Sequence, residues 1–131
     1  MENNVTNATN STNDKNVKLY SILAYIGILW IIGLLVKEKT DKRLRFHVGQ
    51  GILVTLSNVA INLINRLVIY NIFTKTTYVL GSSITTVSST GIAIAGLLSL
   101  VPLVFMIIGI VNAANNKENE LPLIGQLAFY K

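Results

Sequence analysis

Five polar side chains recur along one apolar stretch of the chain, and their type and spacing make them the first candidates for chemistry. They are His47, Gln50, Asn58, Asn62 and Asn65. At roughly 100° per residue, all five fall within about 60° of one line along a helix. Polar groups at membrane depth turn away from lipid, toward the bundle interior, a partner protein or a water-filled cavity. We call this set the polar stripe and treat it as the main candidate for function.

His47 is the only histidine of the chain, and its charge would change near neutral pH if nothing perturbed it. One interpretation is a proton-sensing or gating group that is paired with Gln50 across one helical turn. The other is an interfacial histidine that hydrogen-bonds to the backbone or to lipid phosphate. The sequence leaves both interpretations open.

Catalysis would need further groups that converge on this histidine. The chain has no cysteine, and its apolar runs contain no aspartate or glutamate. Within the membrane, a metal site would therefore lack ligands, and an acid–base pair would lack a second titratable group. We therefore expect neither an enzyme nor a cofactor or metal site.

The row Asn58, Asn62 and Asn65 has two interpretations as well. The amides could hold helices together, each contributing about 0.6 kcal/mol in a membrane. They could instead line a hydrophilic path for ions, solutes or polypeptide. Three helices enclose no wide lumen, so a path would also require oligomerisation.

The composition indicates a membrane protein. Of 131 residues, 51% are hydrophobic and only 13% are charged, which is little charge for a soluble domain of this length. A helix needs about 20 apolar residues to cross a hydrocarbon core of roughly 30 Å. Three runs meet this length, at about 19–36, 46–68 and 91–113. They predict an all-α integral membrane protein with three transmembrane helices.

A basic loop separates the first two runs. Its basic residues are Lys37, Lys39, Lys42, Arg43 and Arg45. Basic residues near span ends face the cytoplasm, and they attract anionic lipid. We therefore expect a multi-pass protein of the cell (inner) membrane, with the N-terminus outside and the C-terminus in the cytoplasm. Five of the eleven basic residues lie in this loop, which fits membrane orientation better than a recognition face, so we expect no nucleic-acid partner.

The rest of the chain completes the predicted domain plan. Residues 1–18 are rich in Asn and Thr and are expected to be disordered, and residues 19–131 form one membrane domain. Residues 70–90 are expected to be a loop, and 117–131 a segment that lies in the membrane interface. Gly91, Ala95 and Ser99 recur every four residues, the spacing that lets membrane helices pack closely.

Two short motifs carry a resemblance to a known family. They are Arg45-Phe46-His47-x-x-Gln50, and Asn112-Ala113 followed by Leu121-Pro122-x-Ile124-Gly125. Their order around the runs resembles a widespread family of small prokaryotic membrane proteins of unknown function. That family is related to the channel component of the chloroplast inner-envelope translocon, the Tic machinery. The resemblance covers roughly residues 19–131 and implies an integral inner-membrane protein.

Two classes of function follow from these features. The first is an accessory or scaffold subunit that binds partner helices in the membrane, either of another protein or of further copies of the same chain. The alternative is an oligomeric channel or transporter subunit whose polar stripe lines the path.

Overall fold

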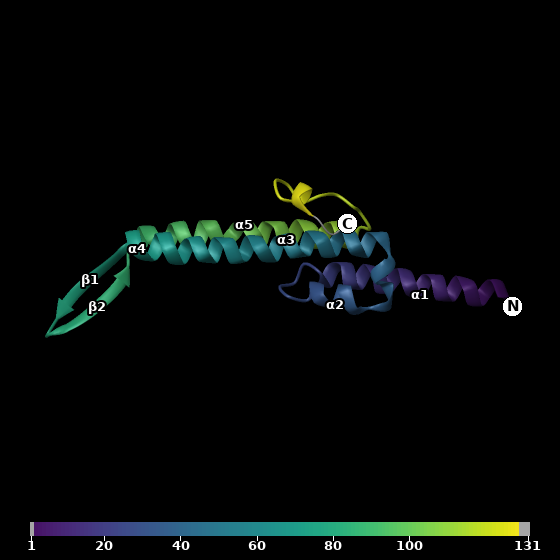
Figure 1. Ribbon diagram of the computed structural model, residues 1–131, viewed down its shortest axis with the longest axis horizontal. Helices are drawn as coiled ribbons and strands as arrows, with labels where there is room; N and C mark the ends of the chain where they lie inside the picture. The colour runs from purple at the N-terminus through teal and green to yellow at the C-terminus, as the bar shows by residue number, and fades with distance from the viewer. Residues whose placement is uncertain (1, 129–131) are drawn as a thin grey trace. The chain divides into compact units, whose positions relative to one another are not determined.

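The computed structural model describes residues 2–128, and the side chains of residues 10–128. The chain divides into two compact units, Met1–Thr55 with Val104–Lys131, and Leu56–Leu103. Two long helices, α3 (Lys42–Ile64) and α5 (Ser89–Ala114), contribute residues to both units (Figure 1).

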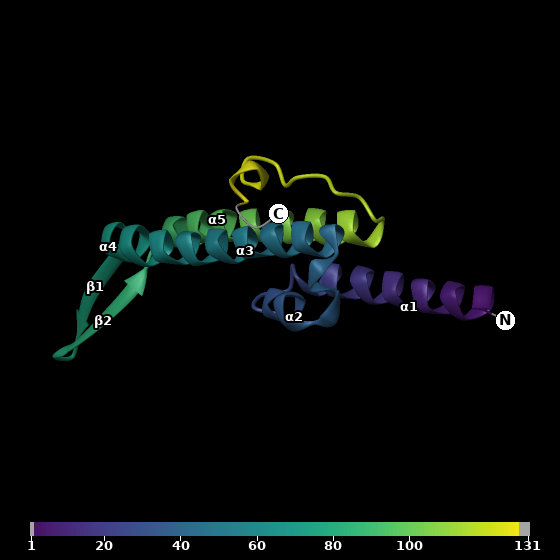
Figure 2. The ribbon, with the colours of Figure 1, turned by 45° about the vertical axis from the view of Figure 1, so that its right-hand side comes forward.

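The first unit begins with a helical hairpin in place of the expected span at 19–36. Helix α1 (Glu2–Leu23) ends early, and the chain reverses into the short helix α2 (Trp30–Leu35), which packs against α1 (Figure 2). Gly27 lies in the reversal with φ +54°, a conformation that glycine adopts without steric cost. The apolar run therefore folds back on itself instead of continuing as one helix.

The Asn/Thr-rich stretch 1–18, expected to be disordered, is helical from residue 2 in α1. Asn, Thr and Ser have low intrinsic helix propensity, so contacts outside the helix must contribute. Two side-chain contacts join α1 to the chain after α2, one at the start of α3 and one in the loop between α2 and α3. Arg43 forms an ion pair with Asp14, and Asn16 donates a hydrogen bond to the Glu38 carboxylate. Residue 1 lies outside the described residues.

That loop is the 3₁₀-helix η1 (Lys37–Thr40), and α3 begins directly after it. Two buried clusters then hold the unit together. One consists of Val17, Ala24, Leu44 and Val48. The other consists of Tyr25, Val54, Phe105, Ala113 and Leu121. The hairpin residues Ala24 and Tyr25, adjacent in the chain, thus pack into different clusters.

Glycines allow the backbones to approach closely in this unit. A Cβ at Gly51 of α3 would collide with the Ala24 carbonyl, and a Cβ at Gly109 of α5 would overlap the Tyr25 ring. The reversal between α1 and α2 therefore rests directly on both long helices. Any larger residue at these positions would push it away.

The chain after α5 folds back onto the first unit and contains the 3₁₀-helix η3 (Gly125–Leu127). Leu121 and Gly125 are buried, whereas Leu123 is exposed. The expected interfacial segment 117–131 is thus partly anchored on the protein through residue 128. Residues 129–131 lie outside the described part of the chain.

The second unit contains a β-hairpin where the sequence analysis expects a loop. After the π-helix η2 (Asn65–Ile69) and the short helix α4 (Tyr70–Ile72), strand β1 (Thr74–Val79) pairs antiparallel with β2 (Ser82–Val87). The strands are rich in β-branched residues, which favour sheet. The expectation of an all-α fold is therefore wrong in this segment.

The turn of this hairpin is tight and conformationally demanding. Leu80 and Gly81 both have positive φ, at +50° and +82°, as a type I′ turn requires. Leucine rarely adopts this conformation, which explains why the sequence gives no clear turn signal at this position.

Two helical stretches of the described chain are long and apolar enough to cross a membrane. They are Lys42–Ile72 and Ser89–Ala114, and they contain the predicted runs 46–68 and 91–113. The third predicted span, 19–36, is not confirmed, because its residues form the α1–α2 hairpin.

We predict that Gly109→Ala destabilises the first unit, because the new methyl group would overlap the Tyr25 ring. Overpacking of this kind costs about 1–3 kcal/mol. Gly96→Ala in the same helix is the matched control, since no atom lies within 4 Å of its added Cβ. Denaturant unfolding in detergent, followed by the helical circular dichroism signal, checks both variants. Equal stability of the two would contradict the packing described here.

Candidate functional site

The structure divides the polar stripe into two parts with different surroundings. His47 and Gln50 are buried in the first unit, whereas Asn58 and Asn62 are exposed in the second. Asn65 is half-buried in the second unit. The two parts therefore need separate explanations.

His47 lies in an aromatic environment within the first unit. Its Nδ1 lies 2.9 Å from the Tyr25 hydroxyl, which belongs to the chain reversal after α1. The rings of Tyr25 and Phe46 both meet the imidazole edge-on. The contact fixes the reversal to α3, so a structural role explains the position of His47. The proton-sensing role stays a prediction.

Gln50 connects its own motif, which begins at Arg45, with the C-terminal motif Leu121-Pro122-x-Ile124-Gly125. Its Nε2 donates to the Gly125 carbonyl at 3.1 Å, and its Oε1 accepts from the Leu121 N–H at 3.3 Å. The side chain is fully buried, and an unpaired polar group there would be costly. One amide therefore satisfies two backbone groups of the C-terminal segment and holds that segment against α3.

Asn58 and Asn62 form an exposed amide pair on α3. The Asn62 Nδ2 donates to the Asn58 backbone carbonyl at 2.8 Å and to its Oδ1 at 2.7 Å. Within the second unit Asn65 donates to the Ser99 hydroxyl at 3.4 Å. Of the three asparagines, Asn65 joins α5 as expected for interhelical contacts, whereas the amide pair faces outward.

A pocket of about 650 Å³ lies beside Asn62, one member of this pair. Its lining residues are Asn62, Asn65, Arg66 and Tyr70. Amide, guanidinium and phenol groups offer hydrogen bonds of both kinds and one positive charge. These groups would allow the pocket to hold a polar or anionic group.

The small residues Gly91, Ala95 and Ser99 are partly used within the second unit. Gly91 is buried, and a Cβ there would lie 2.6 Å from the Cβ of Phe73. Ser99 donates to the Ala95 carbonyl and accepts from Asn65. Close packing at Gly91 is therefore directed to the chain beside β1 and not to a separate helix.

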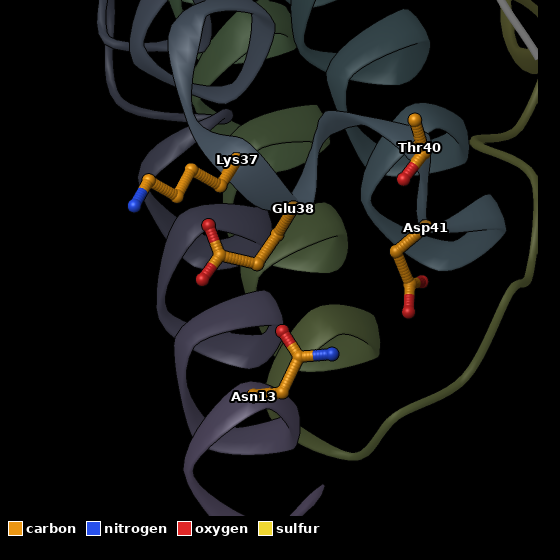
Figure 3. A pocket seen from close by; sticks show the side chains of 5 residues that line it. All are labelled: Asn13, Lys37, Glu38, Thr40 and Asp41. Carbon is orange, nitrogen blue, oxygen red and sulfur yellow. The ribbon is translucent and has the colours of Figure 1, made fainter. Parts of the chain in front are cut away.

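The basic loop has one half-buried basic residue and four exposed ones. Arg43 forms ion pairs with Asp14 and Asp41. The side chains of Lys37, Lys39, Lys42 and Arg45 are exposed. A polar pocket of about 410 Å³ lies beside the loop, where Asn13 of α1 faces Lys37, Glu38, Thr40 and Asp41 (Figure 3). Among residues 10–128, whose side chains are described, no group of three or more His, Cys, Asp or Glu is placed to hold a metal ion.

Sequence reasoning missed Tyr25 and the backbone groups of Leu121 and Gly125. Tyr25 lies in an uninterrupted apolar run, and nothing in its spacing points to His47. The two motifs that contain Gln50, Leu121 and Gly125 are visible in the sequence, but their contact across the fold is not.

We predict that Gln50→Leu releases the C-terminal segment, because it leaves the Leu121 N–H without its partner and leaves the Gly125 carbonyl with only the hydrogen bond from the Ala128 N–H. Each buried unpaired group costs about 1–3 kcal/mol. Hydrogen exchange at the Leu121 amide and protease cleavage within 115–128 should both increase. Asn58→Leu, an exposed position on the same helix, should leave both unchanged. Full protection in the Gln50 variant would rule out this anchoring role.

Comparison with known proteins gives one match. No curated protein and no solved structure matches the chain. The relation to the chloroplast translocon stays a prediction. Residues 15–128, most of the chain, match one family of membrane proteins. The chain therefore belongs to the magnetosome magnetite crystal formation protein family.

Proposed function

We propose that this protein is an accessory or scaffold subunit that binds a partner helix in the membrane through the exposed amide pair Asn58 and Asn62. The observation that carries the proposal is the exposure of two amides on a helix that can span the bilayer. Amides that face lipid are unfavourable, so such groups turn toward protein or water. No other described residue covers this pair, which supports a partner outside the chain.

The position of the pair along the helix agrees with a contact inside the bilayer. Between Arg45 and Arg66 the sequence has no charged residue. That interval corresponds to about 30 Å of helix at 1.5 Å per residue, which is the thickness of the hydrocarbon core. Asn58 and Asn62 lie inside this interval, and Arg66 marks its end. The partner would therefore meet the pair within the membrane.

Family membership supports the setting in which the scaffold would act. The description of the family refers to the formation of magnetite crystals in magnetosomes. We infer that this chain serves that process from within the membrane, by organising other membrane proteins or further copies of itself. In this role the chain would neither catalyse a reaction nor hold a metal.

A channel or transporter subunit is the second candidate. The pocket lined by Asn62, Asn65, Arg66 and Tyr70 favours it, because polar groups of this kind also line hydrophilic paths. Two candidate spans enclose no lumen, so this function would need several copies around a common axis.

We predict that the double substitution Asn58→Leu/Asn62→Leu weakens association with the partner. Two interhelical amides at about 0.6 kcal/mol each correspond to roughly a tenfold loss of affinity. A photo-crosslinker at the exposed Leu63, beside the pair, reports the partner in native membranes, and its yield should fall with the double substitution. Leu56→Val and Val59→Leu exchange apolar for apolar at neighbouring exposed positions of α3 and provide the matched comparison, with the crosslinker kept at position 63.

The outcomes separate the two candidates. Crosslinks to another membrane protein, lost in the double variant without any change in vesicle permeability, support the scaffold. Crosslinks between copies, together with solute flux that is lost while the oligomer persists, support the channel. Crosslinks to lipid alone would exclude both uses of the amide pair.

We also propose a revised orientation in the membrane. Contacts of Asp14 with Arg43 and of Asn16 with Glu38 support an N-terminal helix on the same side as the basic loop. With two spans, both ends of the chain would then lie on the cytoplasmic side, and the β-hairpin on the other. This orientation replaces the expected external N-terminus and keeps the basic loop inside, where its exposed lysines would meet anionic lipid.

Cysteine labelling tests this orientation directly, because the chain has no cysteine of its own. Single cysteines at Asn10, Lys39 and Glu118 should react from the same side of sealed vesicles. A cysteine at Tyr78 in β1 should react only from the other side. Labelling of position 10 together with position 78 would restore an external N-terminus.

A further inference from the structure

The β1–β2 hairpin has no cover within the described chain. All residues of the two strands are exposed except Thr74 and Val87, which are half-buried. Within residues 2–128 the sheet consists of these two strands alone. A lone two-stranded hairpin is marginally stable in water, and a third strand or another packed element is usually needed. The hairpin therefore has the properties of an incomplete sheet.

The two outer edges of the hairpin differ in their protection against pairing. Natural proteins place lysine or proline on edge strands to prevent association. Strand β1 carries Lys75, whereas β2 has the sequence Ser-Ser-Ile-Thr-Thr-Val, with no charge and no proline. The edge of β2 is thus the one that is open to another strand.

The hairpin register shows which groups point outward. Hydrogen-bonded and non-hydrogen-bonded pairs alternate along an antiparallel ladder. The Ser88 N–H donates to the Phe73 carbonyl at 2.7 Å, which makes that pair the hydrogen-bonded kind. Three residues farther along the ladder, the pair Thr76 and Thr85 is then non-hydrogen-bonded. The N–H and C=O groups of Thr85 consequently point away from β1, toward the open edge.

The same alternation directs the backbone groups of Ser83 and Val87 outward. These two residues lie symmetrically about Thr85 along β2. A two-fold axis at Thr85 would place Thr85 opposite its own copy, and Ser83 opposite the partner's Val87. All outward groups of the strand would then find partners at once.

We propose that β2 pairs antiparallel with β2 of a second copy of this chain, centred on Thr85, to form a four-stranded sheet outside the membrane spans. An uncharged edge meets no like charge when it faces itself, and Thr opposite Thr is a favourable cross-strand pair. The contact is isologous, as in most homodimers. It does not depend on the role proposed for Asn58 and Asn62, which lie on α3.

Disulfide crosslinking in membranes tests the pairing, and the absence of native cysteine makes single-cysteine variants clean. At the proposed axis, Thr85→Cys would bring two Cα atoms to about 5.5 Å, within the range of roughly 4.4–6.8 Å that disulfides need. Thr76→Cys is the matched control, because Thr76 faces Thr85 across the hairpin. Across three strand spacings the two copies of position 76 would be about 14 Å apart.

Under mild oxidation we expect Thr85→Cys to shift to a disulfide-linked dimer and Thr76→Cys to stay monomeric. A dimer of equal yield from both variants, or from neither, would overturn the proposal.

A second experiment uses a substitution that disrupts the β2–β2 pairing between copies but keeps the β1–β2 hairpin. Copies with Ser83→Cys, mixed with copies with Val87→Cys, should crosslink to each other. Adding Thr85→Pro removes an outward N–H that the β1–β2 ladder does not use, and the crosslink should be lost. Thr76→Pro removes the corresponding outward N–H of β1 and should leave it intact. Equal effects of the two prolines would overturn the proposal, and neither result bears on the amide pair of α3.

Discussion

The first unit depends on the close seating of one chain reversal against two long helices. Tyr25 lies at the centre of this contact, with its hydroxyl on His47 and its ring against Gly109. Beside it, the Ala24 carbonyl occupies space that any side chain at Gly51 would fill. Because protein interiors are close-packed, such contacts allow little adjustment. The α1–α2 hairpin, the buried end of the polar stripe and the returning C-terminal segment all take their positions from this seating.

A single helix serves two purposes along its length. Near its start, α3 directs His47 and Gln50 inward, where they are satisfied by Tyr25, Leu121 and Gly125. Farther along, its amides are exposed and hydrogen-bond mainly to each other. Buried polar groups that are hydrogen-bonded within the protein stabilise its fold. Exposed polar groups can also form hydrogen bonds with other molecules. The polar stripe therefore has a buried part and an exposed part, although the residue types are similar along it.

Hydrophobic run length predicted the two long helices, since 46–68 and 91–113 each lie within one of the two candidate spans. The same measure failed at 19–36, because apolarity alone does not distinguish a crossing from a hairpin that is buried against other helices. Gly27, with its positive φ, was the local sign of the reversal. Strand pairing at 74–87 was missed because Leu80 occupies a turn position where asparagine or glycine is usual. The contact of Gln50 with the last segment needed the fold itself, since the two are distant in the chain.

The π-helix η2 has a consequence for how the length of this chain can vary. In η2 the Tyr70 N–H bonds to the Asn65 carbonyl, five residues back, so one turn holds an additional residue. Loss of a single residue between 65 and 69 would restore ordinary α-helix and rotate the following segment by roughly 100°. The direction in which the hairpin leaves the helix therefore depends on the number of residues in η2. A substitution at this turn would therefore change the direction of the hairpin less than a deletion of one residue would.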